Sequence, residues 1–342
     1  MTALLPDHQQ LITAMRSAVD DQLQNIVALS GENGATQLHT MLAYQMGWTG
    51  EGDLTQASGK GIRPLLVLLT AEALGGTWNQ ALSGACAVEL LHNFSLIHDD
   101  IEDQSDTRRG RPTLWKKWGI AQAINTGDAM FSLAGIGLLG LSESLSQETT
   151  LKAGRIFHQT CLRLTQGQHL DIAFEVRQKI NLEEYWQMVA GKTAALIALS
   201  TELGAICAGA PADRQSSLRD FGHFLGLAYQ VQDDILGIWG KQEQIGKSTS
   251  GDLISGKKTL PVLFGLTQDE VFTRHWTAQG IQPDDVPQMA ERLEAIGARA
   301  YAQSTADRLT SISLGHLQDS RLEGKAGEAL SQLAEKLLNR KV

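Results

Sequence analysis

The stretch LLHNFSLIHDDIEDQSDTRRGRP, residues 90–112, indicates both the fold class and the chemistry. In its first half, apolar side chains recur every three or four residues, which is the spacing of a buried helix face. It then places four carboxylates within five residues, from Asp99 to Asp103. Residues four apart share a helix face, so Asp99 and Asp103 point the same way. We expect a buried helix that ends in an acidic cluster facing a cavity or solvent.

Helical periodicity extends over nearly the whole chain, whereas the alternating pattern of strands is hard to find. Only 7 of the 342 residues are proline, so long helices can run uninterrupted. No linker or composition break separates domains, and we expect one all-α domain over residues 1–342 with ten or more helices. Loops are expected at residues 104–112 and 240–258. The apolar helical runs cover residues 65–74, 81–97, 121–141, 154–174, 182–208 and 218–238.

The composition excludes several classes of protein. The net charge is −9 and the sequence pI is near 5.5, which argues against a protein that coats nucleic acid. Three cysteines are spread singly, without the spacing of a zinc site or a disulfide framework. The N-terminus lacks the pattern of a signal peptide. The most apolar uncharged stretch, residues 129–142, is shorter than the roughly 20 residues that a membrane span needs. We expect a cytoplasmic protein without a transmembrane segment.

A second acidic pair lies in QVQDDILG, residues 230–237, which also ends an apolar run. Asp233 follows Asp99 by 134 positions, far enough for the two helices to face one another across a bundle. Mg²⁺ takes oxygen ligands and bridges carboxylates to substrate phosphates. Two such acidic helix ends therefore predict Mg²⁺ ions around a diphosphate, where they would promote ionisation of a C–O bond.

Basic residues near these acids supply candidate anion sites. GKGIRP, residues 59–64, is a glycine-flanked basic loop that opens a helix, a favourable place for a phosphate. RRGRP, residues 108–112, directly follows the first acidic cluster. Lys192 precedes a threonine, and Lys247 and Lys257 lie after the second acidic pair. These positions indicate an anionic substrate.

With these motifs the chain resembles the trans-type (head-to-tail) polyprenyl diphosphate synthases, the family of farnesyl and geranylgeranyl diphosphate synthases. The resemblance covers residues 59–263, and the motifs follow one another in the family's order. Beyond those quoted above they are NTGDAMF, GQHLDIAFE, GKTAALI and GKSTSGDLISGKKTLP. The resemblance implies a single large helical bundle of the isoprenoid synthase type around a deep central cavity, usually as a homodimer. It also implies Mg²⁺-dependent condensation of isopentenyl diphosphate with an allylic diphosphate, with three Mg²⁺ ions in each active site.

By resemblance, each motif position takes a role. The metal ligands are Asp99, Asp100, Asp103, Asp233 and Asp234. The site for isopentenyl diphosphate comprises Lys60, Arg63, His92 and Arg109. The allylic substrate contacts are Arg108, Lys192, Thr193, Gln230, Lys247 and Lys257, and a polar pair near the metals is Gln168 and Asp171. The residues expected to carry catalysis are Asp99, Asp100, Asp103, Lys192, Thr193, Gln230 and Asp233, of which Lys192, Thr193 and Gln230 would shield an allylic cation.

Two positions depart from the family pattern, and one region bears on product length. Gly237 stands where the second motif usually ends in a third Asp, and Ser248 replaces a common Pro. Phe94 and Ser95 lie five and four residues before the first motif, where bulk limits the growing chain. An aromatic side chain there resembles enzymes that make C20, with C15 next. The alternative floor residues are Met130, Ser132 and Ala134.

Other readings remain open. A longer-chain polyprenyl diphosphate synthase would share every motif except the chain-length residue. A class I terpene cyclase shares the helical fold but needs no site for isopentenyl diphosphate. An HD-type phosphohydrolase is suggested only by His98-Asp99 and would need further histidine ligands. A non-catalytic partner subunit of another synthase would be expected to lose acidic or basic contacts, and only Gly237 points that way.

Overall fold

The computed structural model describes residues 6–50, 61–240 and 251–338, and the chain divides into two compact units. Unit 1 comprises residues 1–161, 196–219 and 317–332, and unit 2 comprises residues 162–195, 220–316 and 333–342. The division falls within five helices, which therefore contribute residues to both units: α8 (Gln147–Glu175), α10 (Ala195–Cys207), α11 (Ala212–Trp239), α17 (Ala298–Asp319) and α18 (Gly324–Leu338).

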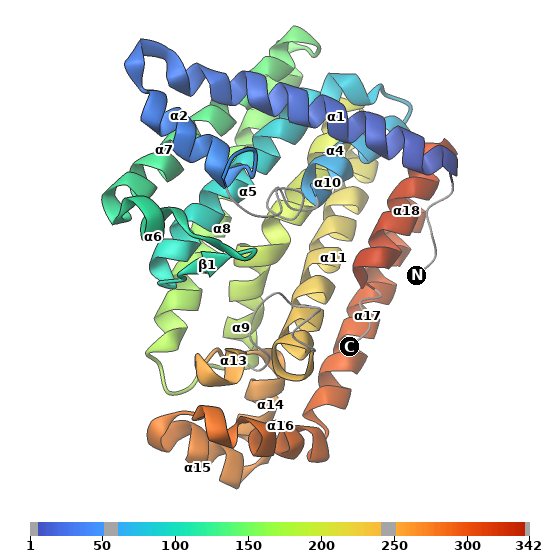
Figure 1. The fold of residues 1–342 in the computed structure, drawn as a ribbon. Helices are drawn as coiled ribbons and strands as arrows, with labels where there is room; N and C mark the ends of the chain where they lie inside the picture. Colours follow the sequence, from blue (N-terminus) through green and yellow to red (C-terminus); the bar gives the residue numbers. More distant parts are fainter. Residues whose placement is uncertain (1–5, 51–60, 241–250, 339–342) are drawn as a thin grey trace. The chain divides into compact units, whose positions relative to one another are not determined.

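In the part of unit 1 that the structure describes, the elements are helices apart from one short hairpin (Figure 1). Its central helix is α5 (Leu82–Glu102), which packs along α7 (Ile120–Leu139), α4 (Ile62–Ala73) and α1 (Pro6–Ala28). The remaining elements of unit 1 are η1 (Leu29–Gly34), α2 (Thr36–Gln45), η2 (Trp78–Ala81), β1 (Thr107–Arg108), β2 (Arg111–Pro112), α6 (Leu114–Trp118), η3 (Gly140–Glu143) and most of α10 (Ala195–Cys207).

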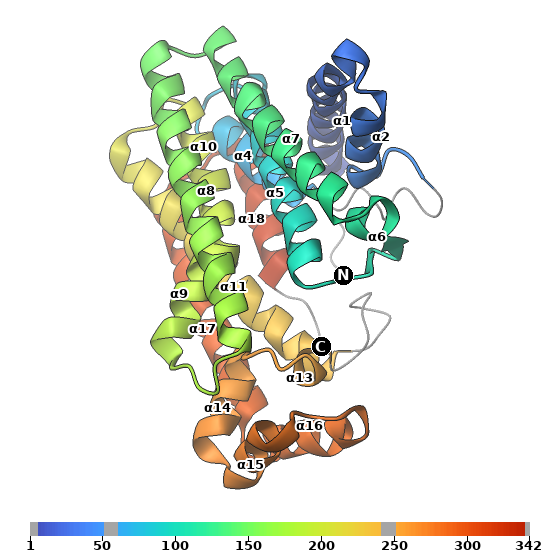
Figure 2. The same ribbon diagram turned by 90° about the vertical axis from the view of Figure 1, so that its left-hand side faces the viewer.

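The core of unit 1 forms around α5, and the view in Figure 2 shows α5 beside α4 and α7. Every residue from Gly84 to Leu91 is buried, and α4 is buried from Pro64 to Ala71. A helix that is apolar on all sides is stable only when neighbours cover it on all sides. The burial lessens toward the C-terminal end of α5, where the acidic cluster lies.

Unit 2 contains the C-terminal parts of α8 and α11 and a small helical module. Its core joins Ile238 of α11 to Leu253, Phe272, Met289 and Leu293 of the module. The further elements are α9 (Leu182–Val189), the π-helical turn η4 (Ala190–Ala194), α13 (Gly251–Ile254), α14 (Leu260–Gln268), α15 (Glu270–Gln279), η5 (Pro283–Asp285) and α16 (Val286–Ala295).

Local sequence signals set several of these helix starts. Asn181 accepts a hydrogen bond from the amide of Glu184 while the Glu184 side chain accepts from the Asn181 amide, which is a capping box at α9. Asp269 accepts from the amide of Phe272 (2.7 Å) at the start of α15 and also pairs with Arg292 (2.8 Å). These contacts satisfy backbone amides that a helix leaves unpaired at its first turn.

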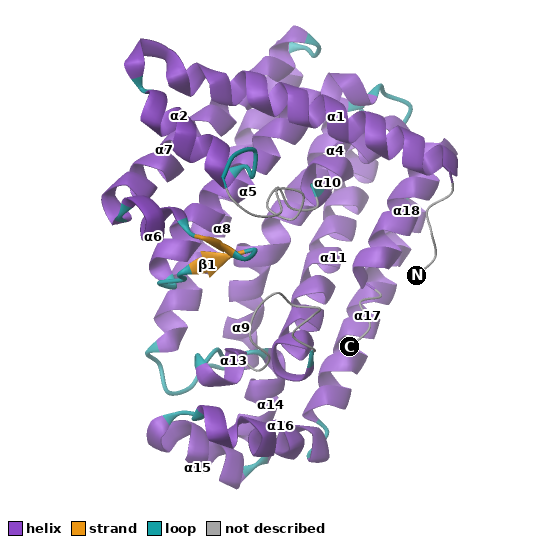
Figure 3. Cartoon of the chain, viewed as in Figure 1, coloured by secondary structure: helices purple, strands orange, loops and turns teal. Residues whose placement is uncertain are grey.

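The expected all-α class is confirmed, and each of the six apolar runs is helical (Figure 3). Two details differ from the expectation. The loop expected at residues 104–112 contains the hairpin β1–β2, in which Thr107 pairs with Pro112 and Arg108 with Arg111. The loop expected at residues 240–258 contains α13, while residues 241–250 lie outside the described part. Strands of two residues are too short to show an alternating sequence pattern.

Among the described residues, two helical segments are long and apolar enough to span a membrane by length and composition alone. They are residues 182–207 and residues 120–143, the second being α7 with η3. The first is 72% buried, as expected for a core helix, whereas the second is only 44% buried. The outward face of α7 therefore lacks a covering partner within the described residues.

Candidate active site

The first acidic cluster lies on the last turn of α5 because a defined cap ends the helix there. The amide of Ser105 donates to the carbonyl of Asp100 (2.9 Å), and the amide of Gln104 donates to that of Ile101 (3.2 Å). Gln104 has a left-handed φ of 50°, so the turn is a Schellman cap without the usual glycine. The C-terminal end of a helix carries partial negative charge, and carboxylates placed there favour a nearby cation.

The hairpin β1–β2 supplies such a cation. Arg109 and Gly110 have φ values of 52° and 74°, the two positive values that a type I′ turn requires. Arg108 then reaches the cluster: its Nε donates to Oδ1 of Asp100 (2.8 Å) and its Nη2 to Oδ2 of Asp99 (3.0 Å). Asp100 is buried, and a charge-assisted hydrogen bond offsets the cost of burying its charge.

The donors of this cluster fit a divalent metal ion chemically, but they are not gathered around one position. Among the described residues, no three His, Cys, Asp or Glu side chains are arranged to hold a metal ion. Carboxylate oxygens are the ligands that Mg²⁺ prefers, and Asp99 and Asp103 lie one helical turn apart. Because Arg108 holds Oδ2 of Asp99, a metal ion bound through that oxygen requires this guanidinium to move.

Positive charge concentrates around His92 of α5. Arg63 in the first turn of α4, His92 on α5 and Arg109 in the hairpin lie close enough to perturb one another. Burial lowers the pKa of His92 well below its usual value, and the charges of Arg63 and Arg109 lower it further. His92 is therefore a neutral imidazole at pH 7. Lys60, predicted for the same group, lies outside the described residues.

Glu89 is a member of this group that the sequence interpretation missed. Burial raises the pKa of the Glu89 carboxyl, while Arg63 and Arg109 act to lower it. Asn93 donates from Nδ2 to the backbone carbonyl of Glu89 (3.0 Å). The sequence signal for Glu89 was its position: it is an acidic residue within an otherwise apolar stretch, three positions before His92. Glu89 thus places a buried carboxyl group in the neighbourhood of the two arginines.

Phe94 packs against an aromatic side chain of α7. Its ring centroid lies 5.2 Å from that of Phe131 and 4.8 Å from that of His98. Ser95 donates its hydroxyl to a backbone carbonyl one turn back (2.8 Å). Phe131 was not singled out from the sequence, although it belongs to the NTGDAMF motif. Of the alternative floor residues on α7, Met130 and Ala134 are buried and Ser132 is exposed.

In unit 2, α8 and the π-helical turn η4 approach closely because both contain glycine at the contact. A Cβ on Gly167 would lie 2.1 Å from the amide nitrogen of Lys192, and one on Gly191 would lie 2.7 Å from the carbonyl oxygen of Arg163. Backbone atoms cannot move aside as the end of a flexible side chain does. This approach allows Nζ of Lys192 to reach Oδ2 of Asp171 (2.5 Å).

Two of the predicted allylic contacts in unit 2, Thr193 and Gln230, are brought together. Thr193, next to Lys192 in η4, donates from Oγ1 to Oε1 of Gln230 on α11 (2.6 Å). Single π-helical turns frequently occur at functional sites. Gln168 lies three residues before Asp171 on α8, so the predicted polar pair shares a helix face.

The two acids of the second motif have different surroundings. Asp233 is partly buried, whereas Asp234 is 3% exposed. Asp234 accepts hydrogen bonds from the Tyr185 hydroxyl (2.7 Å), the Leu260 amide (2.9 Å) and Nε2 of Gln230 (3.0 Å). Burial raises the pKa of Asp234 to about 7, although these three hydrogen bonds act in the opposite direction. Tyr185 and Leu260 were not predicted as site residues.

The missing third acid of the second motif has a structural counterpart. Asp252, on α13, lies over Gly237: a Cβ on Gly237 would be 1.9 Å from Oδ2 of Asp252 and 2.7 Å from its Cγ. The carboxylate of Asp252 thus occupies the space that a side chain at position 237 would take. Its negative charge also raises the pKa of Asp234.

The lysines after the second motif are partly described. The backbone amide of Lys257 donates to the carbonyl of Asp252 (3.0 Å), which orients the start of the GKKTLP segment. Nζ of Lys258 donates to the carbonyl of Phe174 (2.6 Å), near the C-terminal end of α8, where a cation is favourable. Lys247 lies outside the described residues.

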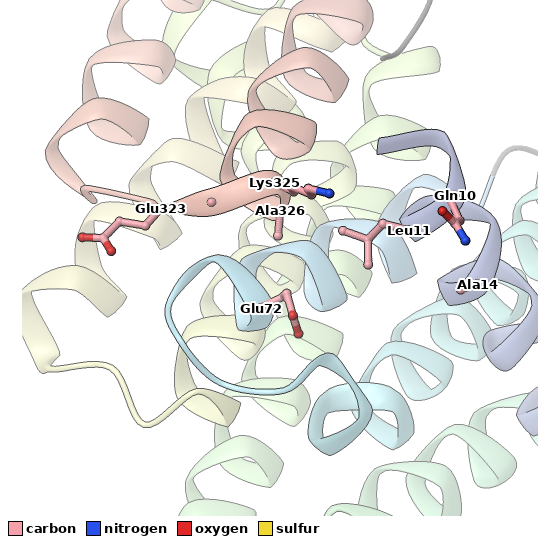
Figure 4. Close-up of a pocket in the computed structure, with 8 residues that line it drawn as sticks. Gln10, Leu11, Ala14, Glu72, Glu323, Lys325 and Ala326 are labelled. Atoms are coloured by element: carbon pink, nitrogen blue, oxygen red, sulfur yellow. The ribbon is translucent and has the colours of Figure 1, made fainter. Parts of the chain in front are cut away.

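Each unit also carries a groove away from the predicted residues. In unit 1, a cavity of about 520 Å³ lies among α1, α4 and the start of α18, with Gln10, Glu72, Glu323 and Lys325 as its polar side chains (Figure 4). In unit 2, a cavity of about 440 Å³ is lined by Trp186, His223 and other residues of α9, α11 and α17. None of the predicted site residues lines either cavity.

Introducing an Asp at position 237 is expected to destabilise the protein, although the family pattern has an Asp there. Gly237→Asp places a second carboxylate against Asp252, and overpacking with like charge should lower the free energy of unfolding by about 1–3 kcal/mol. Urea unfolding measures this loss. Gly237→Asp combined with Asp252→Ala should recover most of it. A Gly237→Asp protein as stable as the wild type would contradict the packing described here.

Comparison with known proteins agrees with this arrangement. Residues 52–293 match the family described as polyprenyl synthetase. The (2E,6E)-farnesyl diphosphate synthase of Mycobacterium tuberculosis is 38% identical over 313 residues, covering 89% of this chain and 86% of that protein. The geranylgeranyl diphosphate synthase of M. tuberculosis is 37% identical over 290 residues, covering 83% and 82%.

Solved structures show the same fold. A polyprenyl synthetase from Streptomyces coelicolor superposes with a TM-score of 0.84 at 33% identity, covering 95% of this chain and 98% of that one. A geranylgeranyl pyrophosphate synthetase from Pyrococcus horikoshii superposes with a TM-score of 0.86 at 28% identity, covering 98% and 100%. The isoprenoid synthase type of helical bundle expected from the sequence is confirmed. The chain belongs to the polyprenyl synthetase family.

Proposed function

We propose that this protein condenses isopentenyl diphosphate with an allylic diphosphate to give a short-chain, all-trans prenyl diphosphate of C20, with C15 next. The observation that carries the proposal is the pairing of an acidic helix end with a group of basic residues on α4, α5 and the hairpin. The relatives named as farnesyl and geranylgeranyl diphosphate synthases align over most of the chain. The names of these two relatives support the proposed product length of C20 or C15.

The predicted metal ligands are carboxylates on two helices. Asp99 and Asp103 share a face at the end of α5, Asp100 lies beside them, and Asp233 is the accessible acid of the second motif. We propose that these residues hold Mg²⁺, up to three ions in each active site. When bound, the ions would neutralise the diphosphate and weaken the allylic C–O bond. Arg108 would exchange its contact with Asp99 for a substrate phosphate.

The remaining residues bind and orient the substrates. Arg63 and Arg109, with Lys60, would hold the diphosphate of isopentenyl diphosphate, and the neutral imidazole of His92 would add one hydrogen-bond donor. The allylic diphosphate would contact further lysines. The oxygens of Thr193 and Gln230 would lie near the positive charge that develops on the allylic group. The contacts assigned to the allylic diphosphate are Lys192, Lys247 and Lys257.

We also propose that both units form one catalytic domain over residues 1–342, because the family match spans parts of each. A cytoplasmic location agrees with the acidic composition and single cysteines. The protein is further proposed to be a homodimer. Its supporting surface is the outward face of α7, where large apolar side chains are 41–66% exposed: Ile120, Ile124, Ile136 and Leu139.

Product analysis tests the proposed reaction. Purified protein with Mg²⁺, isopentenyl diphosphate and a C5, C10 or C15 allylic primer should form C20 or C15 product. Asp99→Ala should reduce the rate at least about a hundredfold, because a ligand for the ions that stabilise transition-state charge is removed. Failure to elongate any primer would favour a partner subunit, and released hydrocarbon would favour a cyclase.

Phe94→Ala should lengthen the product. Removing the ring opens space next to Phe131, so the growing chain can pass beyond the first acidic cluster. Chromatography of the dephosphorylated products should then show C25 or longer chains at the expense of C20. Phe131→Ala is the matched variant on α7 and should act in the same direction. An unchanged product from both variants would exclude this aromatic pair as the floor.

Ile136→Lys should disrupt the proposed dimer. A charged side chain at the centre of an apolar interface costs several kcal/mol, enough to raise the dissociation constant at least about a hundredfold. Sedimentation equilibrium measures the mass of wild type and variant. Ser132→Lys, on the same exposed face of α7, tests whether the interface includes that position. A monomeric wild type, or one that binds vesicles through α7, would reject the dimer.

A further inference from the structure

Asp234 belongs to the motif assigned to metal binding, yet its carboxylate is already engaged by protein donors. Oδ2 accepts from the hydroxyl of Tyr185 (2.7 Å) and from the amide of Leu260 (2.9 Å). Oδ1 accepts from Nε2 of Gln230 (3.0 Å). A carboxylate offers about four acceptor positions, so three of them are used. A metal ion could use only the one remaining acceptor position of Asp234, unless it displaced donors that burial makes costly to leave unpaired.

The three donors come from different elements, which makes the arrangement rigid. Tyr185 lies on α9 and is 1% exposed, and Leu260 is the first residue of α14. Burial and the charge of Asp234 raise the pKa of Tyr185 well above its usual value, so its hydroxyl remains a donor. The amide of Leu260 is one that a helix start leaves without an internal partner. Asp234 therefore joins α9, α11 and α14 at one point.

This anchoring determines how the amide of Gln230 is oriented. Its Nε2 donates to Oδ1 of Asp234 (3.0 Å), and its Oε1 accepts from the hydroxyl of Thr193 (2.6 Å). An amide without such partners can turn over and exchange its oxygen and nitrogen. The carbonyl oxygen carries partial negative charge and attracts a developing cation, whereas the NH₂ group repels one. The orientation of the Gln230 amide therefore affects a reaction that proceeds through an allylic cation.

We propose that Asp234, held by Tyr185, is a positioning residue that keeps the Gln230 amide oxygen beside Thr193, and that it is not a metal ligand. This inference rests on the proposed function, because it assigns Gln230 and Thr193 to the allylic group. It leaves Asp233 as the metal-binding acid of the second motif.

A charge-neutral exchange of side chains tests the proposal. In Asp234→Asn the new NH₂ group faces Gln230 and turns its amide over, which should lower kcat at least about tenfold. Loss of the charged acceptor should also lower Tm by about 2–4 °C. Combining Asp234→Asn with Gln230→Glu keeps the total charge and again places an oxygen beside Thr193. The double variant should therefore recover at least half of the lost Tm and exceed both single variants in kcat.

Metal binding supplies the readout that distinguishes the two roles. Calorimetric titration with Mg²⁺ in the presence of inorganic diphosphate should give an affinity for Asp234→Asn within about twofold of wild type. The matched control, Asp233→Asn, should weaken Mg²⁺ binding about tenfold or more with little change in Tm. Tyr185→Phe removes one donor only, and it should lower Tm while leaving the Mg²⁺ affinity unchanged.

Two results would overturn the proposal: a Mg²⁺ affinity for Asp234→Asn reduced as much as for Asp233→Asn, or a double variant no better than its parents in Tm and kcat. If the wild-type protein forms no prenyl product, the proposed function fails. The Tm values of the single and double variants still decide whether Asp234 orients Gln230.

Discussion

Negative charge at the end of a buried helix is the constraint on which the rest of the site depends. The last turn of α5 carries four carboxylates where the helix itself is partly negative, and Asp100 among them is buried. Such a cluster is stable only with positive charge beside it. The tight hairpin after α5 provides Arg108 as that charge, and a bound metal ion with its diphosphate would provide it during the reaction. The same electrostatic demand thus explains both the resting arrangement and the proposed ligand.

Close backbone approach is the second organising feature, and it depends on glycine. Gly167 and Gly191 let α8 and the π-helical turn meet at backbone distance, which allows Lys192 to reach Asp171. Gly237 leaves room for the carboxylate of Asp252. In both places a side chain is absent so that a charged group from another element can approach. The departure of Gly237 from the family pattern is therefore accompanied by a carboxylate from elsewhere in unit 2.

Much of the fold and many residues of the candidate site could be predicted from the sequence. The elements and residues that were not predicted were missed for physical reasons. The helical runs were recovered because burial of a helix imposes a period of 3.6 residues, whereas a two-residue strand imposes none. Asp99, Arg63 and Gln230 could be singled out as candidate site residues because they belong to recognisable motifs. Glu89 and Tyr185 were not, because a buried acid or tyrosine on an apolar helix resembles an ordinary core residue until its partners are known.

The sequence by itself determined the all-α class, the family and the acidic and basic residues of the motifs, since these follow from local periodicity and local spacing. Only the tertiary structure decided how neighbouring residues of the same type differ in burial and hydrogen bonding. Asp233 and Asp234 are adjacent and chemically identical, yet one is accessible and the other is enclosed by donors from α9, α11 and α14. Burial and hydrogen bonding at a residue depend on segments distant in the chain, and no local pattern records which segments will meet.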